Sequence, residues 1–503
     1  MTTQAPLAAA FDARKNFHTN RASAVFPLRN RAGGDLHIVF LDYWRLKNDI
    51  ENVVVTYRLY DAAGRLVQRQ SQPIQAAHNE TSMAALLAAT GVQGDFDGSV
   101  EVEIISTANI GFPFPAIMGI YESNGLFSGV HSAGRIKNTD EPQKPATSQE
   151  TNWTCKYERD AQGWAVVPFV HFFNSGRPVQ AGATIDVALR GDRGQVLAQK
   201  AVAIDGLGPF ASRLFTLDEV FPELDTLAAA NPFVSVRVTA DAIFPRLVVG
   251  NLYRRLDFLE VTHSFPWSEF ADFCPPPKSP SAYPSMLTAQ TARELALNVK
   301  VFPTNCAGAF DVATQVKAFG EPLVADPSRF QLQAAAGDQA YEFELADGEE
   351  FRVLELRGQV PSRLNASYRY RVRGAQSTFS TDIATGAKSS VYPPKWRHWG
   401  HGRVVGGYRS VMLYRNNTHD PASTKPNEGV LTIYGAGFTH EVPVKVAAES
   451  CVAIRLDEAL RDVPAAREGN GFVSWMLTMK EPVGETFWVS WRDDGAIFGE
   501  HGF

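Results

Sequence analysis

The chain has 503 residues, and at roughly 150 residues per domain this length predicts about three to four domains. Hydrophobic residues make up 45% of the chain and charged residues 20%, a balance that is typical of folded proteins and excludes wholesale disorder. The 48 basic and 54 acidic residues leave a net charge of −6, which excludes a basic field able to hold a nucleic-acid backbone or an anionic membrane.

The N-terminal segment, Met1 to Phe11, has no positive residue ahead of its short apolar run, so the layout of a Sec signal peptide is absent. No window of about 18 apolar residues predicts a transmembrane helix. The four cysteines form no CxxC pair, which argues against zinc-ribbon and thioredoxin-type sites. We therefore expect a cytoplasmic protein without membrane insertion. The alternatives are export by a non-Sec route and a processed mature chain.

Two polar, proline-containing stretches are typical of linkers, and they cut the chain into segments. Residues 138–151 form the first stretch, and residues 274–285 form the second, in which five prolines oppose regular strand pairing. A softer boundary lies in the Gly- and aromatic-rich run of residues 395–407. The predicted organisation is repeat 1 over 1–137, a linker over 138–151, repeat 2 over 152–273, a Pro-rich linker over 274–285, a divergent repeat 3 over 286–402 and repeat 4 over 403–503.

The segments share an order of predicted elements. In the first segment, a strand over Val53–Tyr60 enters a turn over Asp61–Gly64. In the second segment, the strand Thr184–Leu189 enters the turn Asp192–Gly194. Short helices follow, and then a closing strand pair, for which Val100–Ser106 with Ala116–Tyr121 is the first example. The helices are expected over Thr81–Thr90, Leu217–Ala230 and Leu456–Leu460.

Short alternating strands with turn signals every 8 to 12 residues predict antiparallel sandwiches rather than parallel α/β units. The expected fold is therefore all-β, with four tandem antiparallel β-sandwich repeats and short helices in the connections. Each segment resembles a bacterial Ig-like sandwich, and segment two is similar to the sensory rhodopsin transducer family. The points of similarity are Asn174-Ser175-Gly176, Thr184–Leu189, Ser212-Arg213-Leu214, Phe233–Val236 and Pro245–Val248. That family is a homotetrameric accessory protein, so the resemblance implies a binding or scaffolding role without catalytic residues.

Histidines at the segment ends are candidate metal ligands. His131, His263 and His501 each follow an aromatic residue by ten positions, and segment three ends instead in His398 and His401. If the repeats surround a pseudo-axis, their imidazoles converge on one transition metal such as zinc or iron. The alternative is a structural role, in which each histidine bonds a neighbouring carbonyl at its strand end.

A second candidate site lies around the third boundary, where large rings and guanidinium groups gather. Trp396 and Trp399 are expected in a solvated loop, where they could stack on sugar rings, and Arg403, Tyr408 and Arg409 follow them. The arginines form a basic run that could meet an anionic group, and the alternative is that they lie on a solvated strand face.

Standard nucleotide-binding and hydrolase motifs are absent from the sequence, and no catalytic residue can be named. The favoured prediction is thus a non-catalytic binding or scaffold protein without a cofactor, whose partner is itself, another protein or a glycan. One alternative is a metal-dependent enzyme with the histidine site between repeats. The second alternative is a structural component of a phage or cell-surface assembly.

Overall fold

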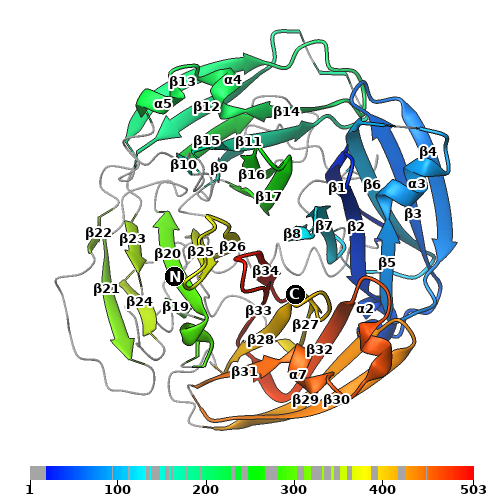
Figure 1. Cartoon of the computed structure of the whole chain (residues 1–503), viewed down its shortest axis with the longest axis vertical. Coiled ribbons are helices and arrows are strands. Elements are labelled where there is room, and N and C mark those ends of the chain that lie inside the picture. The colour runs from blue at the N-terminus through cyan, green and yellow to red at the C-terminus, as the bar shows by residue number, and fades with distance from the viewer. Residues whose placement is uncertain are drawn as a thin grey trace, which may run out of the picture. The chain divides into compact units, whose positions relative to one another are not determined.

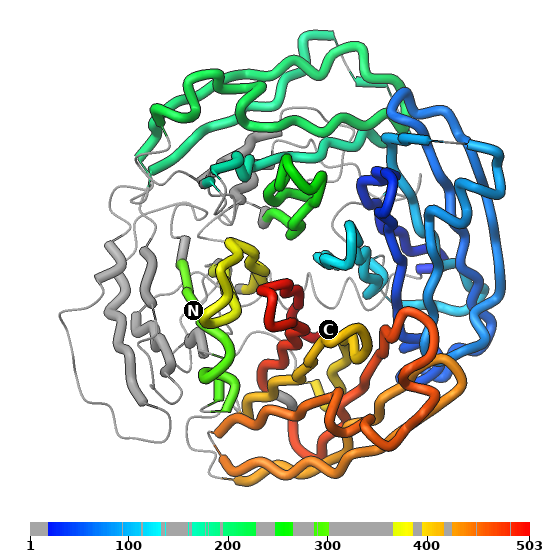
Figure 2. Tube along the Cα trace, in the orientation of Figure 1, coloured from blue at the N-terminus to red at the C-terminus, as the bar shows by residue number. Residues whose placement is uncertain are grey.

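The computed structural model divides into two compact units, one within Ala8–Trp267 and the other within Ser268–Phe503. We call them the N-terminal unit and the C-terminal unit and describe each by itself (Figures 1 and 2). The structure describes residues 19–92, 94–111, 114–131, 136, 148–152, 158–159, 163–176, 178–179, 181–191, 195–227, 233–238, 247–266, 281–284, 286–288, 290–302, 311–318, 331–333, 341–344, 352–358, 365–386, 395–416, 425–448 and 450–503.

The first half of the N-terminal unit forms two four-stranded antiparallel sheets, in the orders β1-β6-β3-β4 and β5-β2-β7-β8 (Figure 1). Their strands are β1 (Arg21–Asn30), β2 (Gly34–Leu41), β3 (Val53–Asp61), β4 (Leu66–Pro73), β5 (His78–Ser82), β6 (Phe96–Ser106), β7 (Ile117–Ser123) and β8 (Leu126–His131). The predicted turn after β3 is confirmed, because Gly64 adopts a φ of 85° and donates its N–H to the carbonyl of Asp61 at 2.9 Å.

The second half of this unit also forms two antiparallel sheets. One has the order β10-β11-β16-β17 with β14 on β11, and the other has the order β13-β12-β15-β9-β18. Their strands are β9 (Ser148–Asn152), β10 (Glu158–Arg159), β11 (Ala165–Phe173), β12 (Thr184–Arg190), β13 (Val196–Ala203), β14 (Ser212–Thr216), β15 (Phe233–Val238), β16 (Val248–Tyr253), β17 (Phe258–His263) and β18 (Phe265–Pro266). Val167 of β11 and Val187 of β12 belong to one buried core, so the two sheets form a sandwich.

The described residues of the C-terminal unit form four antiparallel four-stranded sheets. Their orders are β19-β24-β21-β22, β23-β20-β25-β26, β27-β32-β29-β30 and β31-β28-β33-β34. The strands are β19 (Ser281–Pro284), β20 (Leu295–Phe302), β21 (Asp311–Ala318), β22 (Gln331–Gln333), β23 (Tyr341–Glu344), β24 (Arg352–Gly358), β25 (Asn365–Val372), β26 (Thr381–Gly386), β27 (Lys395–Arg403), β28 (Arg409–Arg415), β29 (Asn427–Gly435), β30 (Phe438–Val446), β31 (Cys451–Arg455), β32 (Phe472–Val483), β33 (Glu485–Trp491) and β34 (Ile497–His501). Leu297 of β20, Tyr368 of β25, Val411 of β28 and Val489 of β33 share one core.

The helices of both units are short and lie in connections between strands. They are α2 (Tyr43–Asn48), α3 (Met83–Ala88), α4 (Leu217–Val220), α5 (Leu224–Leu227), η2 (Thr291–Arg293), α7 (Leu456–Ala459) and η5 (Pro464–Arg467). The predicted all-β class with short connecting helices is therefore confirmed, while the number of repeats stays a prediction. Within the described residues, no helix has both the length and the apolar character needed to cross a membrane.

The predicted closing strand pair is wrong in its pairing. β6 pairs with β1 and β3, whereas β7 pairs with β2 and β8, so β6 and β7 belong to different sheets. Consecutive strands of a sandwich often cross from one sheet to the other, and strand alternation alone does not reveal the crossing. The hairpin that closes this half is β7–β8, and β8 is a strand that we did not predict.

Both predicted linkers contain strand residues at their C-terminal ends. β9 pairs with β15 and β18, and β19 pairs with β24. Sheet pairing uses backbone groups, so polar side chains do not prevent it. Pro284 is tolerated because β19 lies at the edge of its sheet. The turn predicted at Asp192–Gly194 and residues 274–280 of the second linker lie outside the described residues.

Candidate functional site

Two hairpins of the N-terminal unit end in histidine and lie side by side. His131 is the last residue of β8, and His263 is the last residue of β17. The Ser128 hydroxyl of β8 accepts a hydrogen bond from the backbone N–H of Val261 at 2.8 Å. A second link joins the hairpins where the Ser123 hydroxyl donates to the carbonyl of Leu256 at 3.0 Å. The backbone frame thus brings the two strand ends together.

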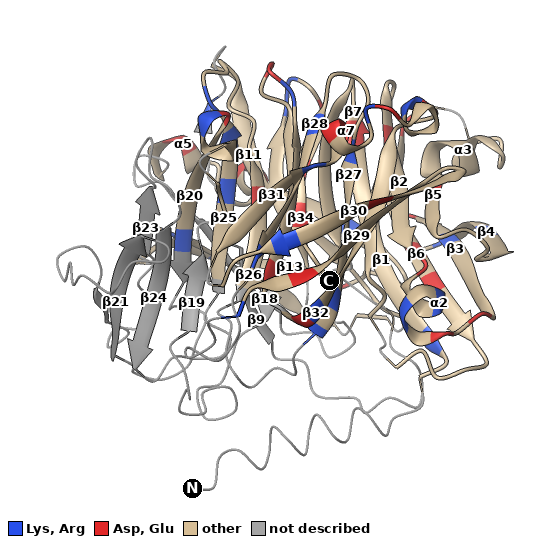
Figure 3. Ribbon diagram, turned by 90° about the horizontal axis from the view of Figure 1, so that it is seen from below, with Lys and Arg blue, Asp and Glu red and all other residues tan. Residues whose placement is uncertain are grey.

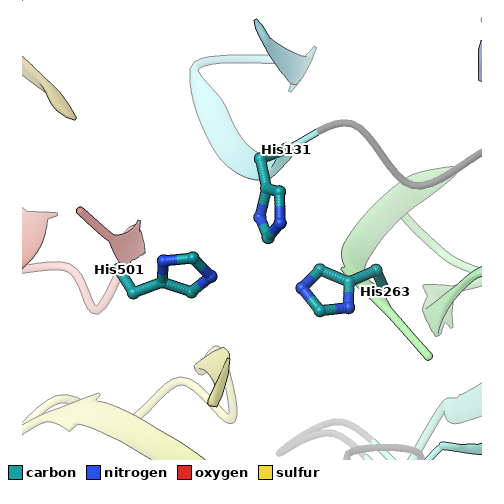
Figure 4. Close-up of side chains that lie close together, drawn as sticks. All are labelled: His131, His263 and His501. Carbon is teal, nitrogen blue, oxygen red and sulfur yellow. The ribbon is translucent and has the colours of Figure 1, made fainter. Parts of the chain in front are cut away.

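The imidazoles of His131 and His263 contact each other (Figure 4). Their ring centroids lie 4.4 Å apart with an interplanar angle of 83°, and the ligand nitrogens of the two side chains lie within 4.8 Å. The two residues are 7% and 1% exposed. The structure therefore places two of the segment-end histidines in contact within one unit, while their metal-binding role stays a prediction.

A backbone carbonyl determines the tautomer of His263. Its Nδ1 lies 2.9 Å from the carbonyl oxygen of Ser264. Because a carbonyl only accepts, Nδ1 carries the proton, and the lone pair of the neutral ring lies on Nε2. In the C-terminal unit, His501 ends β34 and makes the same bond, from Nδ1 to the carbonyl of Gly502 at 2.9 Å. Both the strand-end carbonyl bond and a ligand role are compatible with this geometry, since metal-binding histidines commonly make this contact.

His398 and His401 differ from these strand-end histidines, which corrects the prediction for segment three. Both lie inside β27, which pairs with β32 and crosses the boundary predicted between residues 402 and 403. Residues three apart on a strand face opposite sides, so the HxxH spacing does not form a joint site here. His398 Nδ1 lies 2.9 Å from the Thr486 hydroxyl, and His401 Nδ1 lies 3.0 Å from the Ser474 hydroxyl.

The hairpin of segment three that corresponds in sheet order to β7–β8 is β25–β26, and its last strand is Thr381–Gly386. This strand contains no histidine. The first strand of the next sheet, β27, supplies His398 and His401 instead. The match between segment three and the other segments was wrong at this position, because the predicted boundary divided β27 between two repeats.

The two tryptophans predicted in a loop lie on strand β27 together with Arg403, whereas Tyr408 lies in the turn before Arg409, the first residue of β28. Trp399 and Tyr408 are 5% and 3% exposed, so they do not present a ring face to a sugar, whereas Trp396 is 49% exposed. Arg403 stacks over the Tyr408 ring at 5.1 Å. Arg409 forms ion pairs with Glu294 at 2.6 Å and with Asp493 at 2.8 Å. Of the residues in this predicted site, Trp396 is therefore the aromatic residue whose ring is exposed to solvent.

A polar pocket of about 320 Å³ lies within the N-terminal unit. Four arginines line it, together with the hydroxyl residues Ser212 and Thr216, the acidic residues Asp97 and Glu219, and the apolar residues Pro27, Leu214 and Leu252. The arginines are Arg29, Arg31, Arg213 and Arg254. A stacked contact between Tyr60 and Phe210, with centroids 4.9 Å apart, joins the two halves of the unit near this pocket.

Carboxylates hold three of the four pocket arginines in place. Arg29 and Arg31 share Asp97 and Asp257, with distances of 2.8 to 3.3 Å. Burial alone would lower the pKa of Arg31, but its hydrogen bond and charge contact with Asp97 raise that pKa above its ordinary value. Arg254 forms a pair with Asp218 at 2.6 Å. Basic and acidic residues are also interspersed along the ribbons of both units (Figure 3).

The remaining arginine and a buried histidine complete the pocket. Arg213 is exposed, and its guanidinium lies 4.5 Å from the centroid of the Phe215 ring. His171 is buried, and its Nε2 lies 3.4 Å from the Ser99 hydroxyl. Burial lowers the pKa of His171 to about 3, so the imidazole is neutral at pH 7.

Our sequence reasoning did not find this pocket. Arg29, Arg213 and Arg254 come from segments that are far apart in the chain, and no motif joins them. One local signal exists, which is a pair of arginines close to the end of a strand. Examples are Arg29 with Arg31 at the end of β1 and Arg254 with Arg255 after β16. A surface strand carries such pairs equally often, so the signal has low specificity.

Comparisons with known proteins assign no family. No protein-family model and no curated protein matches the chain. Among solved structures, the chain is similar to a "Biofilm associated protein - BSP domain", with 8% identity, a TM-score of 0.18, and coverage of 98% of this chain and 93% of that one. It is also similar to trypsin-activated alpha-2-macroglobulin from Escherichia coli, with 7% identity, a TM-score of 0.10, and coverage of 93% of this chain and 30% of that one. Scores this low carry no argument about function.

Proposed function

We propose that this chain is a non-catalytic binding protein, in which the β-sandwiches are the scaffold and the pocket of the N-terminal unit binds an uncharged sugar unit of a glycan. The observation that carries the proposal is the arrangement of donors and acceptors around the pocket. Its volume of about 320 Å³ is near the lower end of the range of about 300–1,000 Å³ for ligand pockets. A single ring, or two rings at most, fits such a volume.

The charge of the pocket favours an uncharged ligand. The four arginines are balanced by Asp97 and Glu219 in the lining and by Asp218 and Asp257, which pair with Arg254 and Arg29. These ion pairs fix the guanidinium N–H groups and carboxylate oxygens before a ligand arrives, which lowers the entropic cost of binding. Sugar hydroxyls both donate and accept, so they match a lining that contains both kinds of group.

The same groups are poorly suited to catalysis. Asp97 accepts hydrogen bonds from Arg31 at 2.8 Å to both of its oxygens, so this carboxylate is held in an ion pair. His171, with a pKa of about 3, is a weak base at pH 7. A general acid or base works best with a pKa near the operating pH, which supports binding rather than turnover at this site.

Calorimetric titration with neutral hexoses, N-acetylhexosamines and hexuronates tests the proposal. We expect a neutral sugar to bind, and we expect Arg213→Ala to weaken it at least tenfold, because a charge-assisted hydrogen bond contributes about 1.5–3 kcal/mol. Arg159→Ala is the matched control, since Arg159 is also exposed but pairs with Asp225 and does not line the pocket.

Three outcomes would contradict the proposal. The first is that no sugar binds, and the second is that Arg213→Ala and Arg159→Ala have the same affinity as the unchanged chain. Tighter binding of hexuronates than of neutral sugars would also contradict it, because the ligand would then be an anion.

A further inference from the structure

We infer that His131 and His263 bind a divalent transition-metal ion, with zinc as the reference ion. This inference is independent of the sugar pocket, because neither histidine lines it. Imidazole nitrogen is a preferred ligand for zinc, copper, nickel and cobalt, whereas calcium and magnesium prefer oxygen. Two imidazoles in contact therefore select this class of ion.

The spacing of the two rings fits one shared ion. Two nitrogens bound at about 2.0–2.1 Å to a tetrahedral ion lie about 3.3 Å from each other. The ligand nitrogens of His131 and His263 lie within 4.8 Å (Figure 4). Both side chains would have to bring their nitrogens about 1.5 Å closer together to hold one ion.

The protonation state of His263 is already suitable for a ligand. Its Nδ1–H donates to the carbonyl of Ser264, which places the lone pair of the neutral ring on Nε2. Hydrogen bonds of this kind orient the rings of metal-binding histidines and raise their basicity.

The two hairpins that carry the pair are joined at both ends. The bond from Val261 to the Ser128 hydroxyl lies within three residues of each histidine, and the bond from the Ser123 hydroxyl to Leu256 joins the hairpins at their turn ends. The ring positions are therefore set by paired strands rather than by loops. Binding then costs little ordering of the chain, as in other sites built on rigid elements.

Metal titration of the full-length chain, after treatment with a chelator, tests the inference. Cobalt(II) is the probe, because its visible absorption reports the ligands, and zinc is then added as a competitor. We expect one cobalt ion per chain, displaced by zinc. We expect His131→Ala and His263→Ala each to weaken binding at least 100-fold, because each removes one of two protein ligands.

Two further variants guard against loss of folding. His131→Asn and His263→Asn keep a polar side chain of similar size, and circular dichroism and thermal unfolding of each variant show whether the fold is intact. His440→Ala is the matched control, because His440 is half-buried on β30 and outside the pair. Folded asparagine variants that lose cobalt while His440→Ala retains it would support the inference.

His501 provides the last comparison, since its Nδ1 is fixed by the same kind of bond. Retention of cobalt by His501→Ala, together with its loss in the other two variants, would support the inference. The inference is overturned if the unchanged chain binds no cobalt, if both asparagine variants bind it normally, or if only His501→Ala loses it. None of these results affects the sugar titration, so the two proposals can fail separately.

Discussion

His37 and His263 are both buried in the N-terminal unit, at 3% and 1% exposure, but their surroundings differ. Three carboxylates surround His37: Glu122 at 3.0 Å, Glu80 at 3.2 Å and Asp35 at 3.7 Å. Burial by itself lowers the pKa of His37, but the hydrogen bonds to Glu122 and Glu80 and the charge of Asp35 raise it to about 9. His37 is therefore a cation at pH 7.

His263 has a backbone carbonyl and a second imidazole as neighbours. A carbonyl accepts one ring proton and adds no formal charge, so in the neutral ring the lone pair lies on Nε2. The comparison shows that burial does not decide the role of a histidine on a strand. Its neighbours set its interactions: three carboxylates around His37, and a carbonyl and an imidazole beside His263.

The largest loss of stability is expected from His37→Gln, because this substitution removes the cation and leaves three carboxylates together. The pKa of His37 is raised above the unfolded value of 6.5, so its stabilisation is fully present below about pH 6.5 and is lost as the pH rises through about 9. We expect the variant to lose about 3 kcal/mol of unfolding free energy at pH 6. Urea unfolding at pH 6 and at pH 10 measures it.

Glu122→Gln is the control for this prediction, because it removes the hydrogen bond that contributes most to raising the pKa of His37 while the histidine stays. We expect a smaller loss with the same dependence on pH. An equal loss for His37→Gln at pH 6 and pH 10 would show that packing, and not charge, is the contribution of His37.

The fold class was accessible from the sequence because strand alternation is a local signal. The turn at Asp61–Gly64 and the helices beginning at Met83, Leu217 and Leu456 were predicted for the same reason. The pairing of strands could not be predicted from the sequence, because β6 and β7 are neighbours in the chain but lie in different sheets. Which sheet receives a strand depends on contacts between residues far apart in sequence.

The candidate sites show the same limit. His131 and His263 were identified by their equal spacing from an aromatic residue, which is a repeated local pattern. The role proposed for His398 with His401 depended on a loop, and β27 is a strand. Arg213 and His171 were missed because their shared pocket forms only when the two halves of the N-terminal unit pack together.

An intermediate effect on stability is expected from His171→Gln, because His171 is a buried histidine without the carboxylate neighbours of His37. Burial lowers the pKa of His171 to about 3, and no carboxylate is among the causes of the shift. The unfolded chain binds a proton near pH 6.5 while the folded chain does not, so stability is lost as the pH falls from about 6.5 toward 3. At pH 5 the buried neutral imidazole therefore lowers the free energy of unfolding by about 2 kcal/mol.

We therefore expect His171→Gln to lose less stability than the unchanged chain when the pH is lowered from 7 to 5. Thermal unfolding at both pH values measures the difference. If both proteins lose the same stability between these values, the buried imidazole is not the acid-sensitive group.

The smallest effect is expected from Thr486→Val, which tests a third kind of neighbour. The Thr486 hydroxyl lies 2.9 Å from His398 Nδ1, and both residues are buried in the C-terminal unit. The substitution keeps the shape of the side chain but removes its hydrogen-bonding oxygen, and such a loss costs about 1 kcal/mol. Urea unfolding measures this cost, and Thr486→Ser, which keeps the hydroxyl, is the control. A loss in Thr486→Ser equal to that in Thr486→Val would show that packing, and not the hydrogen bond to His398, is the contribution of Thr486.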